Sequence, residues 1–120
     1  MKNLLPQVFR KRLIIEGFYE VNINEEFIKK FLNELCGFLK MNVIVGPLIF
    51  SPNEKSEVHK GLGGFMAWVE SGVTLYTWNI YKFFTLDIYS CKDFNVENVV
   101  NFVKNILKVS QFVYEEVKYA

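Results

Sequence analysis

Two side chains near the middle of the chain are of the types that do covalent chemistry, the hydroxyl of Ser71 and the thiol of Cys91. Ser71 and Gly72 separate two apolar runs, a pattern that predicts a tight break between two strands. Cys91 closes a third apolar run, thirteen residues after Trp78. A serine at such a break, with a thiol one strand later, indicates chemistry at a strand end. An ordinary hairpin turn is the alternative, because Ser-Gly is common turn material.

Composition is typical of a single-domain globular protein. The 120 residues predict one domain spanning positions 1–120, and hydrophobic residues at 51% supply ample material for one core. The formal net charge of +1 gives no reason to expect a nucleic-acid partner or an anionic membrane surface. Because so small a chain has little interior, part of its apolar surplus is expected at a subunit interface.

The cysteines, the single histidine and the hydropathy pattern exclude further classes. Cys36 and Cys91 form no CxxC motif and His59 offers them little help, so no metal site is expected. Cys36 falls in a helical pattern and is expected to be a buried apolar filler, whereas His59 is expected to be solvated in a polar loop. No apolar run approaches the roughly 20 residues of a membrane helix, and the first residues lack the apolar segment of a secretory signal. The expectation is a soluble, cytoplasmic protein.

Apolar spacing predicts two helices among six strands. The first helix begins after Asn24, whose side chain can accept hydrogen bonds from the free N–H groups of the first turn, and the second begins after Asn95. Gly46 and Pro47 predict a bend within the second strand, since proline cannot donate to a strand ladder. The predicted strands are 8–16, 41–50, 65–70, 73–80, 83–90 and 111–119, the first helix is 25–40, and 51–64 is a polar, glycine-rich loop.

The order of these elements, β-α-β-β-β-β-α-β, defines a fold class. Short connections between three consecutive strands favour an antiparallel meander. Two helices on one face of a mostly antiparallel sheet make a two-layer α+β sandwich. The other face of the sheet is then uncovered and rich in aromatic residues, and a second copy of the chain could cover it.

Four short motifs follow one another along the chain: Phe50-Ser51-Pro52, Glu70-Ser71, Thr77-Trp78, and Asp87-Ile88-Tyr89-Ser90-Cys91-Lys92-Asp93. In this order they resemble the prokaryotic, pyruvoyl-dependent S-adenosylmethionine decarboxylases. The resemblance runs from about Gln7 to the C-terminus, and the predicted element order is also that of this family. It implies an S-adenosylmethionine decarboxylase-like fold, a place in polyamine (spermidine) biosynthesis, an amine substrate and a homodimer.

The resemblance implies a specific chemistry at Glu70 and Ser71. In this family the proenzyme cuts itself between a Glu and a Ser: the Ser hydroxyl attacks the preceding carbonyl, and the resulting ester eliminates to leave a pyruvoyl group. The pyruvoyl ketone then forms a Schiff base with the substrate amine and serves as an electron sink when CO₂ leaves. By resemblance, Ser71 is the pyruvoyl precursor, Glu70 ends the first fragment and Cys91 is the proton donor. Phe50 would stack on the adenine and Trp78 would contact substrate, unless they are a plain strand-end aromatic and a core residue.

The sequence departs from the family pattern at four positions. Gly72 follows the cut-site Ser, where the family usually has His, and Tyr76 replaces the processing and catalytic His five residues after that Ser. Gly63 stands where the family has a second processing Ser, and Ile80 stands where the family has the carboxylate that holds the ribose hydroxyls. A phenol with a pKa of about 10 is a poor base near neutral pH. Losing the carboxylate removes hydrogen bonds worth roughly 1.5–3 kcal/mol each.

Two functions from different classes compete. The first is an active pyruvoyl-dependent carbon–carbon lyase that acts on S-adenosylmethionine or on another amino acid. The second is a non-catalytic relative that binds a small molecule or acts as the regulatory partner of an active paralogue, as a heterodimer. The retained Glu70, Ser71 and Cys91 favour the first, and the four departures favour the second. On balance we expect a family member that processes itself poorly or not at all.

Overall fold

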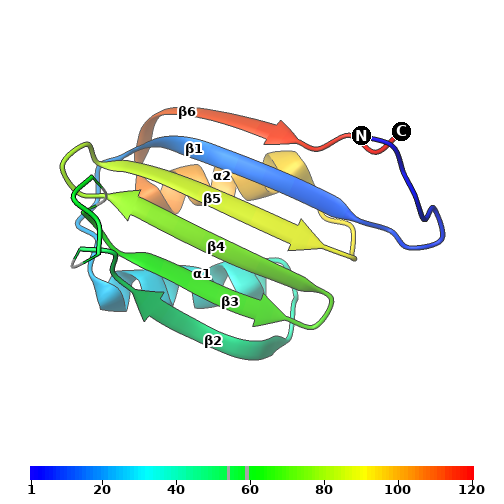
Figure 1. Ribbon diagram of the computed structural model, residues 1–120, viewed down its shortest axis with the longest axis horizontal. Helices are drawn as coiled ribbons and strands as arrows, with labels where there is room; N and C mark the ends of the chain where they lie inside the picture. Colours follow the sequence, from blue (N-terminus) through cyan, green and yellow to red (C-terminus); the bar gives the residue numbers. More distant parts are fainter. Residues whose placement is uncertain (54, 59) are drawn as a thin grey trace.

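The computed structural model describes every residue of the chain except Glu54 and His59, so the expectation for His59 falls outside the described residues. Within the described part, the chain forms a six-stranded sheet and two helices that cover one of its faces (Figure 1). The elements are β1 (Lys11–Tyr19), α1 (Glu25–Phe38), β2 (Val43–Phe50), β3 (Gly63–Trp68), β4 (Ser71–Trp78), β5 (Phe83–Ser90), α2 (Val96–Leu107) and β6 (Val109–Glu116).

The sheet is antiparallel throughout, with strand order β2-β3-β4-β5-β1-β6. Strands β3 to β5 form the predicted three-stranded meander, β2 extends it at one edge, and β1 lies between β5 and β6. The predicted two-layer α+β sandwich, with its element order and both helices on one face, is therefore confirmed.

One core lies between the sheet and the two helices. Alternate strand residues such as Leu13, Leu75 and Leu86 point toward the helices and are fully or almost fully buried. Helix α1 packs tightly on the sheet at Gly64, where an added Cβ would lie 2.6 Å from Ile28 Cγ2. A side chain at position 64 would therefore push α1 away from the sheet.

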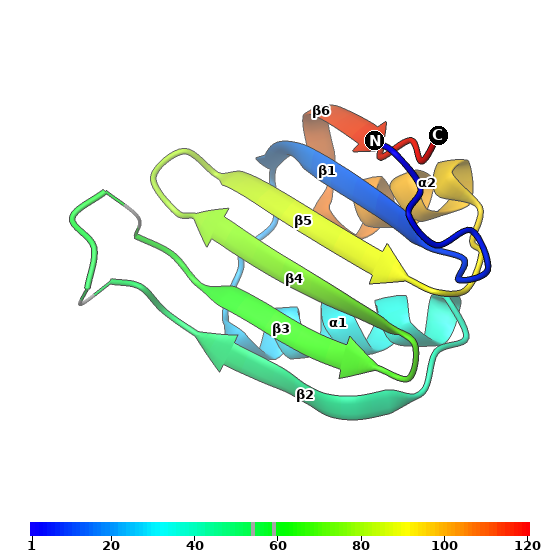
Figure 2. The ribbon, with the colours of Figure 1, turned by 45° about the vertical axis from the view of Figure 1, so that its right-hand side comes forward.

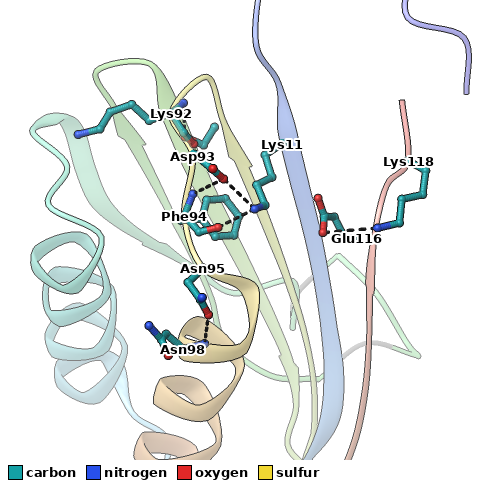
Figure 3. Close-up of polar contacts among 9 residues, drawn as sticks. Lys11, Lys92, Asp93, Phe94, Asn95, Asn98, Glu116 and Lys118 are labelled. Atoms are coloured by element: carbon teal, nitrogen blue, oxygen red, sulfur yellow. Dashed lines mark hydrogen bonds and ion pairs between the residues drawn. The ribbon is translucent and has the colours of Figure 1, made fainter. Parts of the chain in front are cut away.

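Both helices begin where the sequence predicts. The Asn24 side chain accepts the N–H of Phe27 at 2.8 Å, and the Asn95 side chain accepts the N–H of Asn98 at 2.8 Å (Figure 3). The segment before α2 is also fastened to β1, because Lys11 Nζ contacts the Asp93 carboxylate at 2.8 Å. Helix α1 ends at Phe38, short of the predicted residue 40.

The predicted break at Ser71 and Gly72 is wrong by two residues. The turn consists of Val69 and Glu70, and Ser71 and Gly72 are the first residues of β4. Because Trp68 pairs with Ser71, only two residues remain for the turn. Positive φ falls on the second of them, Glu70, at 71°, which is the position where a type II turn requires it. The turn is predicted at Gly72 because glycine is common in turns, but here Gly72 is a strand residue.

Most other strand boundaries differ from prediction by two or three residues: β1 ends at 19 rather than 16, β2 begins at 43 rather than 41, β3 ends at 68 rather than 70, β4 is 71–78 rather than 73–80, and β6 is 109–116 rather than 111–119. Strand β1 begins at Lys11 rather than at residue 8, and β3 begins at Gly63, inside the stretch predicted as a loop. The paired glycines there are strand residues, because each lies under a bulky neighbour that leaves no room for a side chain. The predicted bend in β2 is present: its register with β3 shifts between Val45 and Leu48, around Gly46 and Pro47, at the edge of the sheet.

The sheet face opposite the helices, here called the open face, carries apolar and aromatic side chains. Ile14, Phe18, Phe65 and Tyr76 are each between 37% and 40% exposed. Cys36 is buried as predicted, bonds to the Met41 carbonyl at 3.3 Å, and has its thiol pKa raised by that burial. None of the described helices has the length and apolar character needed to cross a bilayer.

Candidate functional site at the start of strand β4

The β3–β4 turn lies beside the end of β5, at one end of the sheet (Figure 2). Ser71 follows this turn and pairs with the end of β5, so its hydroxyl lies at this end of the sheet. Ser71 opens β4 and pairs directly with Ser90, the last residue of β5. Its Oγ lies 2.8 Å from Ser90 Oγ and 3.5 Å from Met41 Sδ. Ser71 is partly buried, so a nucleophile is held here at the margin of the core rather than on a free loop.

The peptide carbonyl before Ser71 is also held. The Glu70 carbonyl oxygen accepts the backbone N–H of Cys91 at 2.7 Å. Such a donor withdraws electron density from the carbonyl and would stabilise negative charge that develops on its oxygen. Glu70 itself has a positive φ of 71°, a conformation that costs a non-glycine residue about 1–3 kcal/mol. The peptide bond between residues 70 and 71 therefore follows a residue in a costly backbone conformation, and its carbonyl oxygen is polarised by the Cys91 N–H.

Cys91 lies beside this bond, with its side chain on the open face. Its Sγ lies 3.0 Å from the Tyr89 hydroxyl, and the Arg12 guanidinium lies 4.4 Å from the centre of the Tyr89 ring. The hydrogen bond to Cys91, and next to it burial, raise the pKa of Tyr89. Cys91 thus has a neutral phenol as its partner.

The structure separates Tyr76 from Ser71. Tyr76 lies five residues farther along β4 on the open face, about 16 Å away at the rise of an antiparallel strand. It pairs with Gly63, and its ring packs edge-on against Phe50 with 5.2 Å between centroids. Within one chain, Tyr76 cannot reach the Glu70–Ser71 bond.

The Phe50 ring fills the space above Gly63. A Cβ built on Gly63 would overlap the Phe50 ring and would lie 2.9 Å from the Leu75 carbonyl oxygen. The position where the resemblance expects a second processing serine therefore has no room for one while Phe50 keeps its place. Phe50 and Tyr76 form an aromatic pair next to Gly63, at the end of β4 far from Ser71.

Trp78 and Ile80 lie at this same far end. Trp78 is half-buried and contacts Phe83, with 5.5 Å between ring centroids, while the core tryptophan of the sheet is Trp68. Ile80, at the tip of the β4–β5 hairpin, is 79% exposed. Beside them is a shallow recess of about 440 Å³, lined by Phe18, Trp78, Tyr81 and Phe83. Aromatic rings at the surface can bind a flat ring or an organic cation.

A groove of about 350 Å³ runs over the middle of the open face, with Arg12, Phe65, Asp87 and Tyr89 among its lining residues. Desolvation, and next to it the negative charge of Glu16, raise the pKa of Asp87. The sequence alone assigns no role to Ser90, Tyr89 or Arg12. Strict alternation along β5 could have placed Tyr89 with Cys91, but the contacts of Ser90 and Arg12 cross between strands.

The described residues contain no group of three metal-ligating side chains. A pyruvoyl group would arise from Ser71 itself, and the residues present fit such an origin: a hydroxyl, a preceding carbonyl held by an N–H, and a strained Glu70.

Comparisons with known proteins agree with this architecture. The chain is similar to the crystal structure of the adenosylmethionine decarboxylase from Aquifex aeolicus VF5, with a TM-score of 0.73, 14% identity, and coverage of 94% of this chain and 92% of that chain. At this identity the likeness establishes the fold, that of an adenosylmethionine decarboxylase-like α+β sandwich. No curated protein sequence matches the chain.

A sequence model of the S-adenosylmethionine decarboxylase family matches residues 14–119. The chain therefore belongs to the S-adenosylmethionine decarboxylase family. The resemblance drawn from the four motifs is confirmed at the level of family and fold. The roles of Glu70, Ser71, Cys91, Phe50 and Trp78 stay predictions.

Proposed function

We propose that this protein is a divergent S-adenosylmethionine decarboxylase-like protein of the cytoplasm that keeps a self-cleavage site at Glu70–Ser71 but processes it slowly. The observation that carries this proposal is the pair of contacts around one bond, Cys91 N–H on the Glu70 carbonyl at 2.7 Å and Ser90 on the Ser71 hydroxyl at 2.8 Å.

In the proposed reaction, Ser71 Oγ adds to the Glu70 carbonyl carbon and the C–N bond breaks. The Ser71 nitrogen takes up the proton, and an ester joins the two parts. Loss of the Ser71 α-hydrogen then expels the Glu70 carboxylate and leaves a dehydroalanine at position 71. Water hydrolyses the imine form of this residue, which releases ammonia and leaves a pyruvoyl group. A pyruvoyl ketone, once present, supplies an electron sink for decarboxylation of an amino acid bound through its amine.

The second half of this reaction is the reason why we expect processing to be slow. Removing the Ser71 α-hydrogen needs a base, and the side chains to which Ser71 Oγ bonds are a hydroxyl and a thioether, neither of which is a base near neutral pH. Tyr76 is remote within the chain. The site therefore favours ester formation over elimination.

The open face supports a dimer as part of the proposal. A second copy packed there would cover Ile14 and Phe65, and could bring the Tyr76 end of one chain to the Ser71 end of the other. Such a dimer would also place Phe50 and Trp78 near a substrate held at Ser71, with Cys91 as the proton donor. The substrate would be S-adenosylmethionine or another amino acid, in polyamine synthesis.

Intact mass under denaturing conditions tests self-cleavage. Fresh protein is expected to contain mostly the unbroken chain, and prolonged incubation should produce fragments 1–70 and 71–120. The Ser71→Ala variant, which has no nucleophile, should give neither fragment. A wild-type chain that stays whole after long incubation, also with hydroxylamine present to cleave any ester, would overturn the proposal.

A non-catalytic subunit is the second candidate function, and one observation favours it. The Phe50 ring fills the space above Gly63 and contacts Tyr76, which closes the end where the family has its serine and histidine. Such a protein would bind the ligand, or an active paralogue, without reacting. Calorimetry with S-adenosylmethionine on the Ser71→Ala variant separates the two, and CO₂ release by the wild-type protein alone would exclude this second function.

A further inference from the structure

Ser90 makes three hydrogen bonds at the end of β5, although its side chain is fully buried. Its Oγ lies 2.7 Å from the Lys92 carbonyl oxygen, 2.8 Å from the Lys92 backbone nitrogen and 2.8 Å from Ser71 Oγ. A hydroxyl has one proton to donate and two lone pairs that accept. Its capacity is therefore used completely.

The direction of each bond follows from its partners. The Lys92 carbonyl can only accept, so it takes the Ser90 proton, and the Lys92 N–H can only donate, so it uses one Ser90 lone pair. Ser71 Oγ has two acceptors in reach, Met41 Sδ at 3.5 Å and Ser90 Oγ at 2.8 Å. Because Lys92 takes the Ser90 proton, two hydroxyl oxygens only 2.8 Å apart need the Ser71 proton between them, and the remaining Ser90 lone pair accepts it. Ser90 therefore cannot donate to Ser71, and the Ser71 lone pairs are left to face other groups.

The same short segment also holds the other reacting group. Cys91, between Ser90 and Lys92, donates its N–H to the Glu70 carbonyl oxygen at 2.7 Å. Residues 90 to 92 thus fix the hydroxyl proton on one side of the bond and the carbonyl oxygen on the other. Addition of Ser71 Oγ to the Glu70 carbon needs such an orientation, because a lone pair must face the carbon and the proton must point away.

We propose that Ser90 is the positioning residue for Ser71: as an obligate acceptor it turns the Ser71 proton away and presents the lone pairs for attack on the Glu70 carbonyl. This inference rests on the proposed function for its consequence, the rate of ester formation, but the hydrogen-bond direction can be measured independently.

The alternative is a purely structural role, in which Ser90 only satisfies the backbone of Lys92. Thr77 provides a matched control, because its hydroxyl is also fully buried and brackets a backbone in the same way, with Leu62 N at 3.1 Å and Leu62 O at 2.7 Å, and it also hydrogen-bonds a second side chain, that of Tyr19. Thr77 lies toward the opposite end of β4 from Ser71. Thr77→Val therefore measures what losing a buried bracketing hydroxyl does to the fold alone.

Hydroxylamine trapping gives the first readout, because hydroxylamine cleaves the ester at Glu70 without any need for elimination. Ser90→Ala is expected to slow hydroxylamine-dependent appearance of fragment 1–70 by about tenfold, as expected for the loss of one orienting hydrogen bond. Ser90→Thr, which keeps the hydroxyl, should restore the rate to within about threefold, and Thr77→Val should leave it unchanged. Thermal melting of each variant verifies folding.

The second readout does not depend on cleavage. In the Ser71→Cys variant, peptide mass spectrometry follows alkylation of the introduced thiol against pH. An acceptor at Ser90 stabilises the protonated thiol, so adding Ser90→Ala should shift the alkylation midpoint to lower pH, and Thr77→Val should not.

The two readouts separate the two proposals. If the wild type yields no trapped fragment but Ser90→Ala lowers the midpoint, self-cleavage is wrong and the role of Ser90 as acceptor stands. If the wild type yields fragments while Ser90→Ala leaves both rate and midpoint unchanged, or raises the midpoint, the positioning role of Ser90 is wrong.

Discussion

At the residue scale, two aspartates, Asp87 and Asp93, have environments that shift their pKa values in opposite directions. Desolvation and the charge of Glu16 raise the pKa of Asp87 from its ordinary 3.8, whereas hydrogen bonding to Lys11, and next to it the charge of Lys11, lower the pKa of Asp93. A raised pKa means that the ionised Asp87 costs stability once the pH is above that pKa. A lowered pKa means that Asp93 adds stability above 3.8, and that this is lost as the pH falls through its folded value.

These environments predict opposite effects of two like substitutions. Asp87→Asn should raise the melting temperature at pH 7, and the gain should disappear as the pH falls below about 4. Asp93→Asn should lower the melting temperature at pH 7, and the loss should likewise disappear at lower pH. Melting curves between pH 3 and 7 test this prediction. If both substitutions shift the melting temperature in the same direction at pH 7, the opposite environments of Asp87 and Asp93 are wrong.

Gly63 carries a second prediction at this scale. Gly63→Ser should destabilise the protein by about 1–3 kcal/mol, because the new Cβ overlaps the Phe50 ring. Gly72→Ala is the matched control: its Cβ would meet only the Met66 carbonyl oxygen at 3.4 Å, so we expect a change within about 0.5 kcal/mol. Urea denaturation measures both. Adding Phe50→Ala should reduce the cost of Gly63→Ser, and an additive double variant would show that the ring is not the obstacle.

The sequence identified Ser71, Glu70 and Cys91 as neighbours but could not supply their hydrogen bonds. The motif that contains Ser90 and Cys91 is continuous in sequence, and its pairing with β4 follows from the meander. Which hydroxyl donates to which depends on a register of single residues, and the predicted turn is two residues away from the real one. The distance from Ser71 to Tyr76, by contrast, is fixed by strand geometry once both are assigned to β4.

At the element scale, the contact of α1 with β3 is controlled by Gly64. Gly64→Ala should destabilise the fold by about 1–3 kcal/mol, because its Cβ would lie 2.6 Å from Ile28 and 2.8 Å from Leu32. Gly37→Ala, at an exposed position in the last turn of α1, meets nothing within 4 Å and should stabilise the fold by up to about 1 kcal/mol. Chemical denaturation of the pair tests this, and equal effects would mean that α1 can shift freely over the sheet.

Helix starts could be predicted from the sequence because their signal is local. Asn24 and Asn95 accept N–H groups three residues later, an interaction set by adjacent residue types. The β3–β4 turn could not, because its positive φ falls on Glu70 while the neighbouring glycine is used in a strand. Gly63 and Gly64 are predicted as loop residues for a related reason. Glycine is needed at these two strand positions because Phe50 and α1, which are distant in sequence, leave no room for a side chain.

At the scale of the whole molecule, the open face predicts self-association. Ile14→Lys should convert the proposed dimer to a monomer, because a charge would replace an apolar side chain at its centre. The substitution is compatible with folding, since residue 14 pairs with Asp87. Asn33→Lys on the exposed face of α1 is the control. Sedimentation velocity measures the state, and a wild-type monomer at high concentration would contradict the proposed dimer.

The position of β1 has a consequence for the chain after any cut at residue 70. The first piece would hold β1, β2 and β3, and the second β4, β5 and β6, yet in the sheet they alternate, with β1 inserted between β5 and β6. Backbone hydrogen bonds of three strand pairs would hold the two pieces together: β3 with β4, β5 with β1, and β1 with β6. A nicked molecule would therefore travel as a single particle on a native column, and its halves would part only when the sheet itself is unfolded.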